Sequence, residues 1–120
     1  PTMPHEPYRT LDGSIITELV RPEAEGSQNL SVAEAVIDPG RATLRHFHRS
    51  SEEVYYVLAG EGVLLVAGRQ IPVTAGQAHL IAPGVEHSIR CIGTAPLRIL
   101  CLCAPAYQHE DTVVAQGVAT

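Results

Sequence analysis

Short segments rich in Val, Ile, Leu and Tyr follow one another along this chain, and Gly, Pro or charged residues interrupt them at nearly regular intervals. Segments of this length and composition are typical of strands, whereas no longer stretch keeps the apolar stripe of a helix. The intervening glycines and prolines favour tight turns. The pattern predicts an all-β fold. We expect strands at 14–20, 30–37, 54–59, 63–67, 79–82, 87–92 and 97–103.

We expect the chain to form a single domain, 1–120, because a chain of this length can bury a self-sufficient core. Short strands in this number fit an antiparallel jelly-roll β-barrel. An immunoglobulin-like sandwich is the alternative, but the chain has no Trp and no cysteine pair with the separation typical of that fold. We place an N-terminal strand at 14–20, a mobile loop at 21–29, the core barrel at about 30–104 and an irregular tail at 105–120.

The charge and hydropathy of the chain argue against several classes of partner. The formal net charge is −5, and the eight basic residues, all Arg, form no cluster that could neutralise a phosphate backbone, so we expect no nucleic-acid partner. No apolar run approaches the roughly 20 residues of a membrane-spanning helix, so we expect no membrane partner. Residues 1–10 lack the basic-then-apolar order of a secretory signal, and we therefore expect a cytoplasmic protein.

The three cysteines leave one unpaired under any disulfide scheme, so reduced thiols are the simpler interpretation. Cys101 and Cys103 share one face of the expected strand 97–103, with Cα atoms roughly 6.5–7 Å apart. That separation disfavours a disulfide between them. We expect both to be buried thiols that pack as small apolar side chains.

His46 and His48 stand two residues apart, and on a strand this spacing points both imidazoles to the same side. Neutral imidazole nitrogen is a common ligand of first-row transition metals, so the pair is a candidate metal clamp. Taken alone, a His-x-His pair is more often an ordinary surface or core feature. The functional interpretation therefore depends on further ligands.

An acidic pair, Glu52 and Glu53, precedes the apolar strand expected at 54–59. Glu53 shares strand parity with Tyr55 and Val57. If that face is internal, a carboxylate among apolar neighbours is costly unless it is paired or bound to a cation. The alternative is that both glutamates lie solvated in a turn before the strand.

His87 follows a Pro-Gly turn and begins the strand expected at 87–92, where the turn can aim its side chain at the barrel mouth. Two histidines on one strand, a glutamate at the start of the next and this third histidine make a set of three nitrogens and one oxygen. Such a set leaves coordination positions for water or substrate. The predicted metal ligands are His46, His48, Glu53 and His87, here called the quartet.

At these positions the sequence resembles the cupin superfamily. Its first motif, G-x5-H-x-H-x3,4-E-x6-G, is matched at every spacing by Gly40, the two histidines, Glu53 and Gly60. The interval to Gly60 fits Glu53 and not Glu52. The second motif, G-x5-P-x-G-x2-H-x3-N, is matched by Gly76, Gly84 and His87, with Ala82 in place of the usual Pro and Cys91 in place of Asn.

The resemblance implies a jelly-roll barrel with one divalent transition metal per chain near one end: Fe, Mn, Ni, Zn, Co or Cu. Cupins include dioxygenases, isomerases, decarboxylases, lyases and non-catalytic binders, so the fold does not define the reaction. We expect a metal-dependent enzyme acting on a small oxygen-bearing molecule; the alternative is a non-catalytic metal or small-ligand binding module. The resemblance also favours a homodimer, as does the N-terminal strand 14–20, whose edge needs a cover.

Candidate catalytic groups beside the metal are Tyr55, which shares parity with Glu53, and His79, on the short strand expected at 79–82. A structural role in the core is the alternative for both. Arg41 and Arg45 could orient an anionic substrate or be solvated. Cys91 shares strand parity with His87, so it could be a soft neighbour of the metal, but we expect it simply to pack in the interior. His109-Glu110-Asp111 resembles a metal site in composition, but we interpret it as solvated because no strand frames it.

Overall fold

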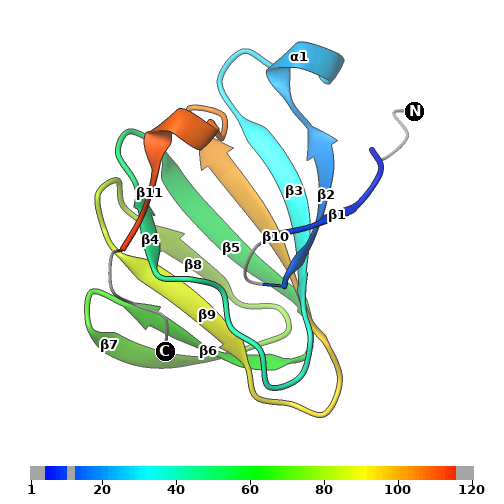
Figure 1. The fold of residues 1–120 in the computed structure, drawn as a ribbon, viewed down its shortest axis with the longest axis vertical. Coiled ribbons are helices and arrows are strands. Elements are labelled where there is room, and N and C mark those ends of the chain that lie inside the picture. Colours follow the sequence, from blue (N-terminus) through cyan, green and yellow to red (C-terminus); the bar gives the residue numbers. More distant parts are fainter. Residues whose placement is uncertain (1–4, 11–12, 116–120) are drawn as a thin grey trace.

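The structure is a computed structural model that describes residues 5–10 and 13–115, and nearly all of the regular secondary structure within them is β-strand (Figure 1). The strands form two antiparallel sheets. One has six strands in the order β1-β2-β3-β10-β5-β8, and the other has five in the order β11-β4-β9-β6-β7. The expectation of an antiparallel all-β fold is confirmed.

The elements follow the sequence pattern closely. The six-stranded sheet consists of β1 (Tyr8–Arg9), β2 (Ile15–Val20), β3 (Ser31–Ile37), β10 (Leu97–Ala104), β5 (Glu52–Ala59) and β8 (Ala78–Ile81). The five-stranded sheet consists of β11 (Thr112–Val114), β4 (His46–His48), β9 (His87–Cys91), β6 (Glu61–Val66) and β7 (Arg69–Thr74). Two short helical turns complete the description, α1 (Pro22–Glu25) and the 3-10 turn η1 (His109–Asp111).

The hydrophobic core lies between the two sheets. Along each strand, alternate side chains point inward, and apolar residues from both sheets meet there. Ile99 of the six-stranded sheet and Leu64 and Ile89 of the five-stranded sheet are each 1% exposed. Burying a side chain of this size stabilises the fold by roughly 1.5–3 kcal/mol. The core therefore holds the two sheets face to face.

The glycine that ends the first cupin-like motif has a specific backbone role. Gly60 lies between β5 and β6 with φ +91, a left-handed conformation that side chains rarely adopt. A Cβ atom here would lie 2.7 Å from the carbonyl oxygen of Pro96 and 2.9 Å from Cα of Leu97. The motif thus requires glycine where the turn approaches the β10 backbone.

Three strands, β1, β7 and β11, and both short helical turns were not expected from the sequence. The loop predicted at 21–29 contains α1, and the polar segment Arg69–Thr74 forms β7. Pro72 lacks a backbone N–H and therefore argues against a strand in the sequence. Because β7 lies at the edge of its sheet, the missing hydrogen-bond donor is tolerated there. The prediction that 105–120 is irregular is wrong for part of its length, because η1 and β11 form there; 116–120 lie outside the described residues.

The N-terminal edge of the six-stranded sheet is partly covered. β1 pairs with β2 through Tyr8 opposite Ile16 and Arg9 opposite Ile15, and the backbone N–H of His5 donates to the carbonyl of Glu18. An uncovered β2 edge is therefore not a sufficient reason to expect a dimer. The described part of the chain contains no helix with the length and hydropathy of a membrane span.

Candidate metal centre

The quartet is assembled from both sheets. His46 and His48 lie on β4 and point to the same side, with Phe47 between them, and His46 lies opposite His87 of β9. Glu53 comes from β5 in the other sheet. The expected strand parity of this carboxylate is confirmed, because Glu53 is 5% exposed whereas Glu52 is exposed.

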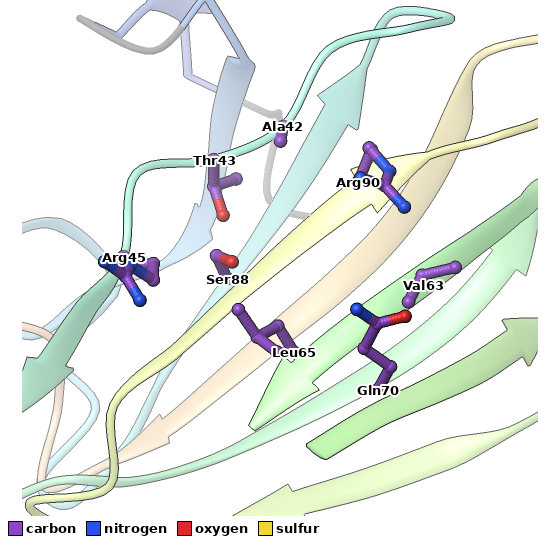
Figure 2. Close-up of a pocket in the computed structure, with 8 residues that line it drawn as sticks. All are labelled: Ala42, Thr43, Arg45, Val63, Leu65, Gln70, Ser88 and Arg90. Atoms are coloured by element: carbon purple, nitrogen blue, oxygen red, sulfur yellow. The ribbon is translucent and has the colours of Figure 1, made fainter. Parts of the chain in front are cut away.

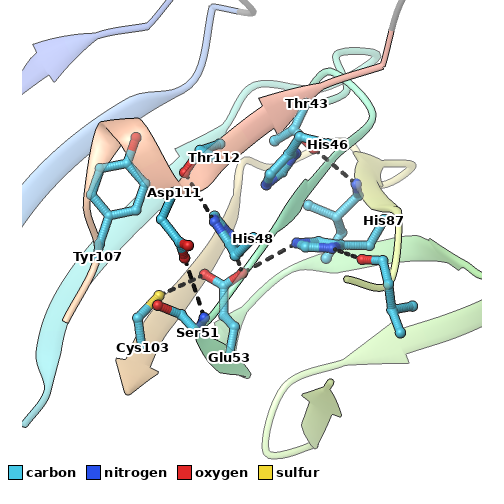
Figure 3. Close-up of polar contacts among 12 residues, drawn as sticks. Thr43, His46, His48, Ser51, Glu53, His87, Cys103, Tyr107, Asp111 and Thr112 are labelled. Atoms are coloured by element: carbon cyan, nitrogen blue, oxygen red, sulfur yellow. Dashed lines mark hydrogen bonds and ion pairs between the residues drawn. The ribbon is translucent and has the colours of Figure 1, made fainter. Parts of the chain in front are cut away.

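The side chains of the quartet converge in the interior (Figure 3). Oε1 of Glu53 lies 3.2 Å from Nε2 of His48 and 3.2 Å from Nε2 of His87. The rings of His46 and His87 have centroids 4.3 Å apart. One potential ligand atom from each of the four residues lies within 4.8 Å of all the others. The sequence therefore identified four residues that the fold brings together from positions up to 41 apart (46 to 87).

Two of the three histidines direct Nδ1 away from the cluster and onto the local backbone. The Nδ1–H of His46 donates to the carbonyl of Leu44 at 2.8 Å, and that of His87 donates to the carbonyl of Val85 at 2.9 Å. A carbonyl oxygen can only accept, so each Nδ1 carries the proton. The Nε2 atom of each ring is then the one that can offer a lone pair to an ion.

His48 reaches the same ring form through a residue of the C-terminal segment. Its Nδ1 lies 3.0 Å from Oγ1 of Thr112, and that hydroxyl donates its own proton to the carbonyl of Gln108 at 3.2 Å. With its proton used in that way, the hydroxyl accepts from the Nδ1–H of His48. All three rings therefore present Nε2 to the interior of the quartet.

The electrostatics of the cluster favour an ionised Glu53 carboxylate and a neutral His46 imidazole at neutral pH. Burial alone would raise the pKa of Glu53, but hydrogen bonds from His48 and His87 outweigh burial and hold this pKa at about 2. Burial, together with repulsion by His87, lowers the pKa of His46 to about 4. An anionic oxygen and an unprotonated nitrogen are the forms that bind a cation.

The donor set fits a first-row divalent ion. Adjacent ligands of an ion bound at about 2.1 Å lie roughly 3 Å apart, and the two contacts of 3.2 Å to Glu53 are close to that spacing. Three imidazole nitrogens and one carboxylate oxygen suit Fe, Mn, Ni, Zn, Co or Cu. The site therefore has the chemistry and the spacing that an ion requires.

A thiol also contacts the quartet. Cys103 lies opposite Glu53 in the pairing of β10 with β5, and its Sγ–H donates to Oε2 of Glu53 at 3.5 Å. Burial, followed by the charge of Glu53, raises the pKa of this thiol above its usual range. Cys103 therefore stays protonated and occupies the second oxygen of the carboxylate. The sequence indicated a buried thiol but gave no sign of its partner.

Of the two candidate catalytic residues, Tyr55 contacts the quartet and His79 lies beside Tyr55. Tyr55 is buried, and its ring meets that of His87 edge-on with centroids 5.7 Å apart. His79 of β8 pairs with Tyr55 across the sheet, and its Nε2 is buried with no hydrogen-bond partner among the described residues. Catalysis by either residue stays a prediction.

The arginines near β4 do not face the quartet. Arg41 is exposed, and Arg45 lies 3.7 Å from Glu86. Arg45 also lines a pocket of about 270 Å³ with Ser88 and Arg90 (Figure 2). Ser88 and Arg90 alternate along β9 with the inward-facing His87, so this pocket lies on the outer face of the sheet and contains no member of the quartet.

The remaining candidates have structural roles. Cys91 is 1% exposed in the core, and its Sγ–H donates to the carbonyl of Ala95 at 3.3 Å, so it packs rather than approaches the quartet. His109 and Glu110 are exposed, as expected. The expectation that no strand frames this segment is wrong, because β11 begins at Thr112, directly after Asp111.

Comparison with known proteins gives a consistent family. The model of the cupin domain family matches residues 33–103, which is more than half of the chain. Uncharacterized protein MJ1618 of Methanocaldococcus jannaschii is 43% identical over 109 residues, covering 91% of this chain and 87% of that protein. The oxalate-binding protein of Thermotoga maritima is 32% identical over 85 residues, covering 71% of this chain and 70% of that protein.

The fold is also similar to that of a solved structure. The crystal structure of a predicted oxalate decarboxylase from Thermotoga maritima superposes with a TM-score of 0.73 at 28% identity. The match covers 87% of this chain and 93% of that chain. The sequence motifs, the arrangement of the sheets and the relatives thus lead to the same family.

Proposed function

The chain belongs to the cupin family, and we propose that it binds one divalent transition metal through the quartet and uses it to act on a small oxygen-bearing molecule. The observation that carries this proposal is that the three histidines share one tautomer, with the proton on Nδ1. Each has its Nδ1 proton engaged outside the cluster, so that three Nε2 atoms and the Glu53 carboxylate converge. A chance cluster of histidines has no reason to share one ring form.

The proposed chemistry divides between the ion and the chain. When bound, a divalent metal supplies a Lewis acid that orients a substrate oxygen and stabilises developing negative charge. Glu53 offsets only part of the charge of a bound dication, so the occupied site would keep a net positive charge that attracts an anionic ligand. Tyr55 and His79 are proposed as the groups that move or hold a proton, because Tyr55 contacts His87 and His79 is paired with Tyr55 on the same face of the sheet.

The ligand to test first is a small dicarboxylate. One relative is named an oxalate-binding protein and one similar structure a predicted oxalate decarboxylase. A chelating pair of oxygens suits an ion that retains open coordination positions. We propose oxalate or a related keto or hydroxy acid as the ligand class, with decarboxylase or other lyase, dioxygenase and isomerase reactions as the candidate activities.

The test is a ligand titration on matched samples of metal-loaded and metal-free protein. Oxalate and a panel of small keto and hydroxy acids should bind only the metal-loaded form, measured by calorimetry and by the visible spectrum of the Co²⁺ form. If every acid leaves the Co²⁺ spectrum and the heat unchanged, this ligand class is wrong. Turnover and oxygen consumption should then be followed together, since of these candidate reactions only dioxygenation consumes oxygen.

A non-catalytic binding module is the second candidate, favoured by the oxalate-binding relative. The two functions differ in what Tyr55 and His79 do. In an enzyme, Tyr55→Phe and His79→Gln should reduce turnover of the bound acid while its affinity changes little. In a binding module, the bound acid should be recovered chemically unchanged from the wild-type protein under all metals and oxygen conditions.

A further inference from the structure

We propose that Thr112 is a positioning residue that holds His48 in the ring form and orientation required for metal binding, and that the C-terminal segment 108–115 acts as a strap that keeps it in place. This inference rests on the proposed metal site. It concerns a residue outside the quartet and the cupin-like motifs, and outside the family match at 33–103.

The strap is hydrogen-bonded along β4, the strand that carries two of the ligands. β11 pairs antiparallel with β4 (Figure 1), which places Thr112 opposite His48 (Figure 3). Val114 lies opposite His46 in the same pairing. At one end of this pairing, the backbone N–H of Ala115 donates to the carbonyl of Arg45 at 2.9 Å. These bonds fix the register that brings the Thr112 hydroxyl to His48.

The strap is also hydrogen-bonded to the turn that leads from β4 to Glu53. The Asp111 carboxylate accepts the backbone N–H of Ser50 at 2.9 Å and that of Ser51 at 3.2 Å. The backbone N–H of Arg49 donates to the carbonyl of Asp111 at 2.8 Å. Asp111, directly before Thr112, therefore holds the strap against the connection between the histidine pair and the glutamate.

The hydrogen bond to Thr112 differs in kind from those of the other two rings. His46 and His87 each donate to the carbonyl of the residue two positions earlier, which no substitution can remove. His48 depends on a side chain 64 residues away. Its acceptor is the only one of the three that a point mutation can delete, and the other two rings serve as internal controls.

Losing this acceptor should weaken metal binding for a defined reason. Without an oxygen at Thr112, the Nδ1–H of His48 has no partner in the strap, so the ring form with Nε2 protonated competes more strongly. That form cannot bind an ion through Nε2. Removing such a partner of a metal-bound histidine typically costs roughly 10- to 100-fold in metal affinity.

The first test compares Co²⁺ affinity among three variants by competition with a chelator. Thr112→Val replaces the hydroxyl with a methyl group of similar size, whereas Thr112→Ser keeps the oxygen. Thr74→Val is the matched control, because Thr74 is exposed on β7 at the opposite edge of the same sheet. We expect roughly 10- to 100-fold weaker binding for Thr112→Val and little change for the other two.

The second test observes the hydrogen bond itself. In the proton spectrum of the Co²⁺ form, the Nδ1–H of each bound histidine should give a strongly shifted resonance that disappears in D2O. Wild type, Thr112→Ser and Thr74→Val should show three such resonances. In Thr112→Val, one resonance should exchange faster with water and broaden, while the two from His46 and His87 stay unchanged. A general structural defect would disturb all three.

The outcomes separate this inference from the proposed function. If the wild-type protein fails to bind Co²⁺, the metal site is wrong. If the wild type binds and Thr112→Val matches it in affinity and in all three resonances, Thr112 does not position His48. If Thr112→Ser is as weak as Thr112→Val, the hydroxyl is not the group that matters, and the inference fails. Thermal unfolding of the metal-free variants identifies any that do not fold.

Discussion

Nε2 of His87 lies 3.2 Å from Oε1 of Glu53, although 34 residues separate them. Nδ1 of His87 already donates a proton to the carbonyl of Val85. Because Glu53 is ionised, a hydrogen bond from the same ring to this carboxylate needs a second proton on the imidazole. The same reasoning applies to His48. Without a metal, protons occupy the space between Glu53 and the two rings where we propose that the ion binds.

Metal binding should consequently release protons. An ion and a proton compete for the same Nε2 lone pairs, so we expect the bound ion to displace protons from the cluster. The affinity should fall as the pH is lowered. Calorimetric titration in two buffers of different ionisation enthalpy measures the number directly. A binding heat that does not depend on the buffer would contradict this arrangement.

The stability of the metal-free protein should depend on pH through His46. Its pKa is lowered from 6.5 to about 4 by burial and by His87, so between these pH values only the unfolded chain takes up the proton. The part of the unfolding free energy that depends on His46 is therefore fully present above pH 6.5. It is lost as the pH drops to about 4, which lowers the stability by up to roughly 3 kcal/mol. Denaturant unfolding in EDTA measures the slope. His46→Gln should flatten it, and an identical slope in the variant would show that His46 is not responsible.

The same substitution should weaken metal binding at Glu53 and leave it unchanged at Glu52. Glu53→Gln keeps the volume but removes the charge that offsets the dication, so metal affinity should fall by at least roughly 10- to 100-fold. Glu52 is exposed on the outer face, so Glu52→Gln should change stability by no more than about 0.5 kcal/mol and leave affinity unchanged. The reverse result would mean that the register of β5 is wrong.

The homodimer stays a prediction, and the outer face of the six-stranded sheet is the surface we propose for it. Val32, Leu102, Val54 and Leu80 lie in one cross-strand row there, and Leu80 is 66% exposed. An apolar row of this kind on a sheet face favours burial against a second copy. Light scattering at micromolar concentration should give a dimer for the wild type and a monomer for Leu80→Glu. A monomeric wild type would refute the proposal.

The quartet could be predicted from sequence because its signals are local. Alternation along a strand pairs His46 with His48 and groups Glu53 with Tyr55 and Val57, and the structure buries Glu53 in that register. The motif spacing then adds His87. None of these steps requires knowledge of which strands are neighbours.

The contribution of the C-terminal segment could not be predicted in this way. Thr112 meets His48 only because a three-residue strand pairs with β4 at a separation of 64 residues, and a segment that short has no distinctive periodicity. From composition, His109 to Asp111 could be interpreted only as a metal-like or a solvated segment. Asp111 matters for the backbone N–H groups it accepts, a role that composition does not indicate.

The central claim is that the quartet binds a metal, and the metal content of the protein tests it most directly. Protein produced in metal-replete medium and purified without an affinity tag or chelator should carry about one transition-metal ion per chain by elemental analysis. The double variant His46→Ala, His48→Ala, which removes both nitrogens of β4, should carry essentially none while remaining folded by circular dichroism. An unchanged stoichiometry in a folded double variant would show that the ion binds elsewhere and would contradict the claim.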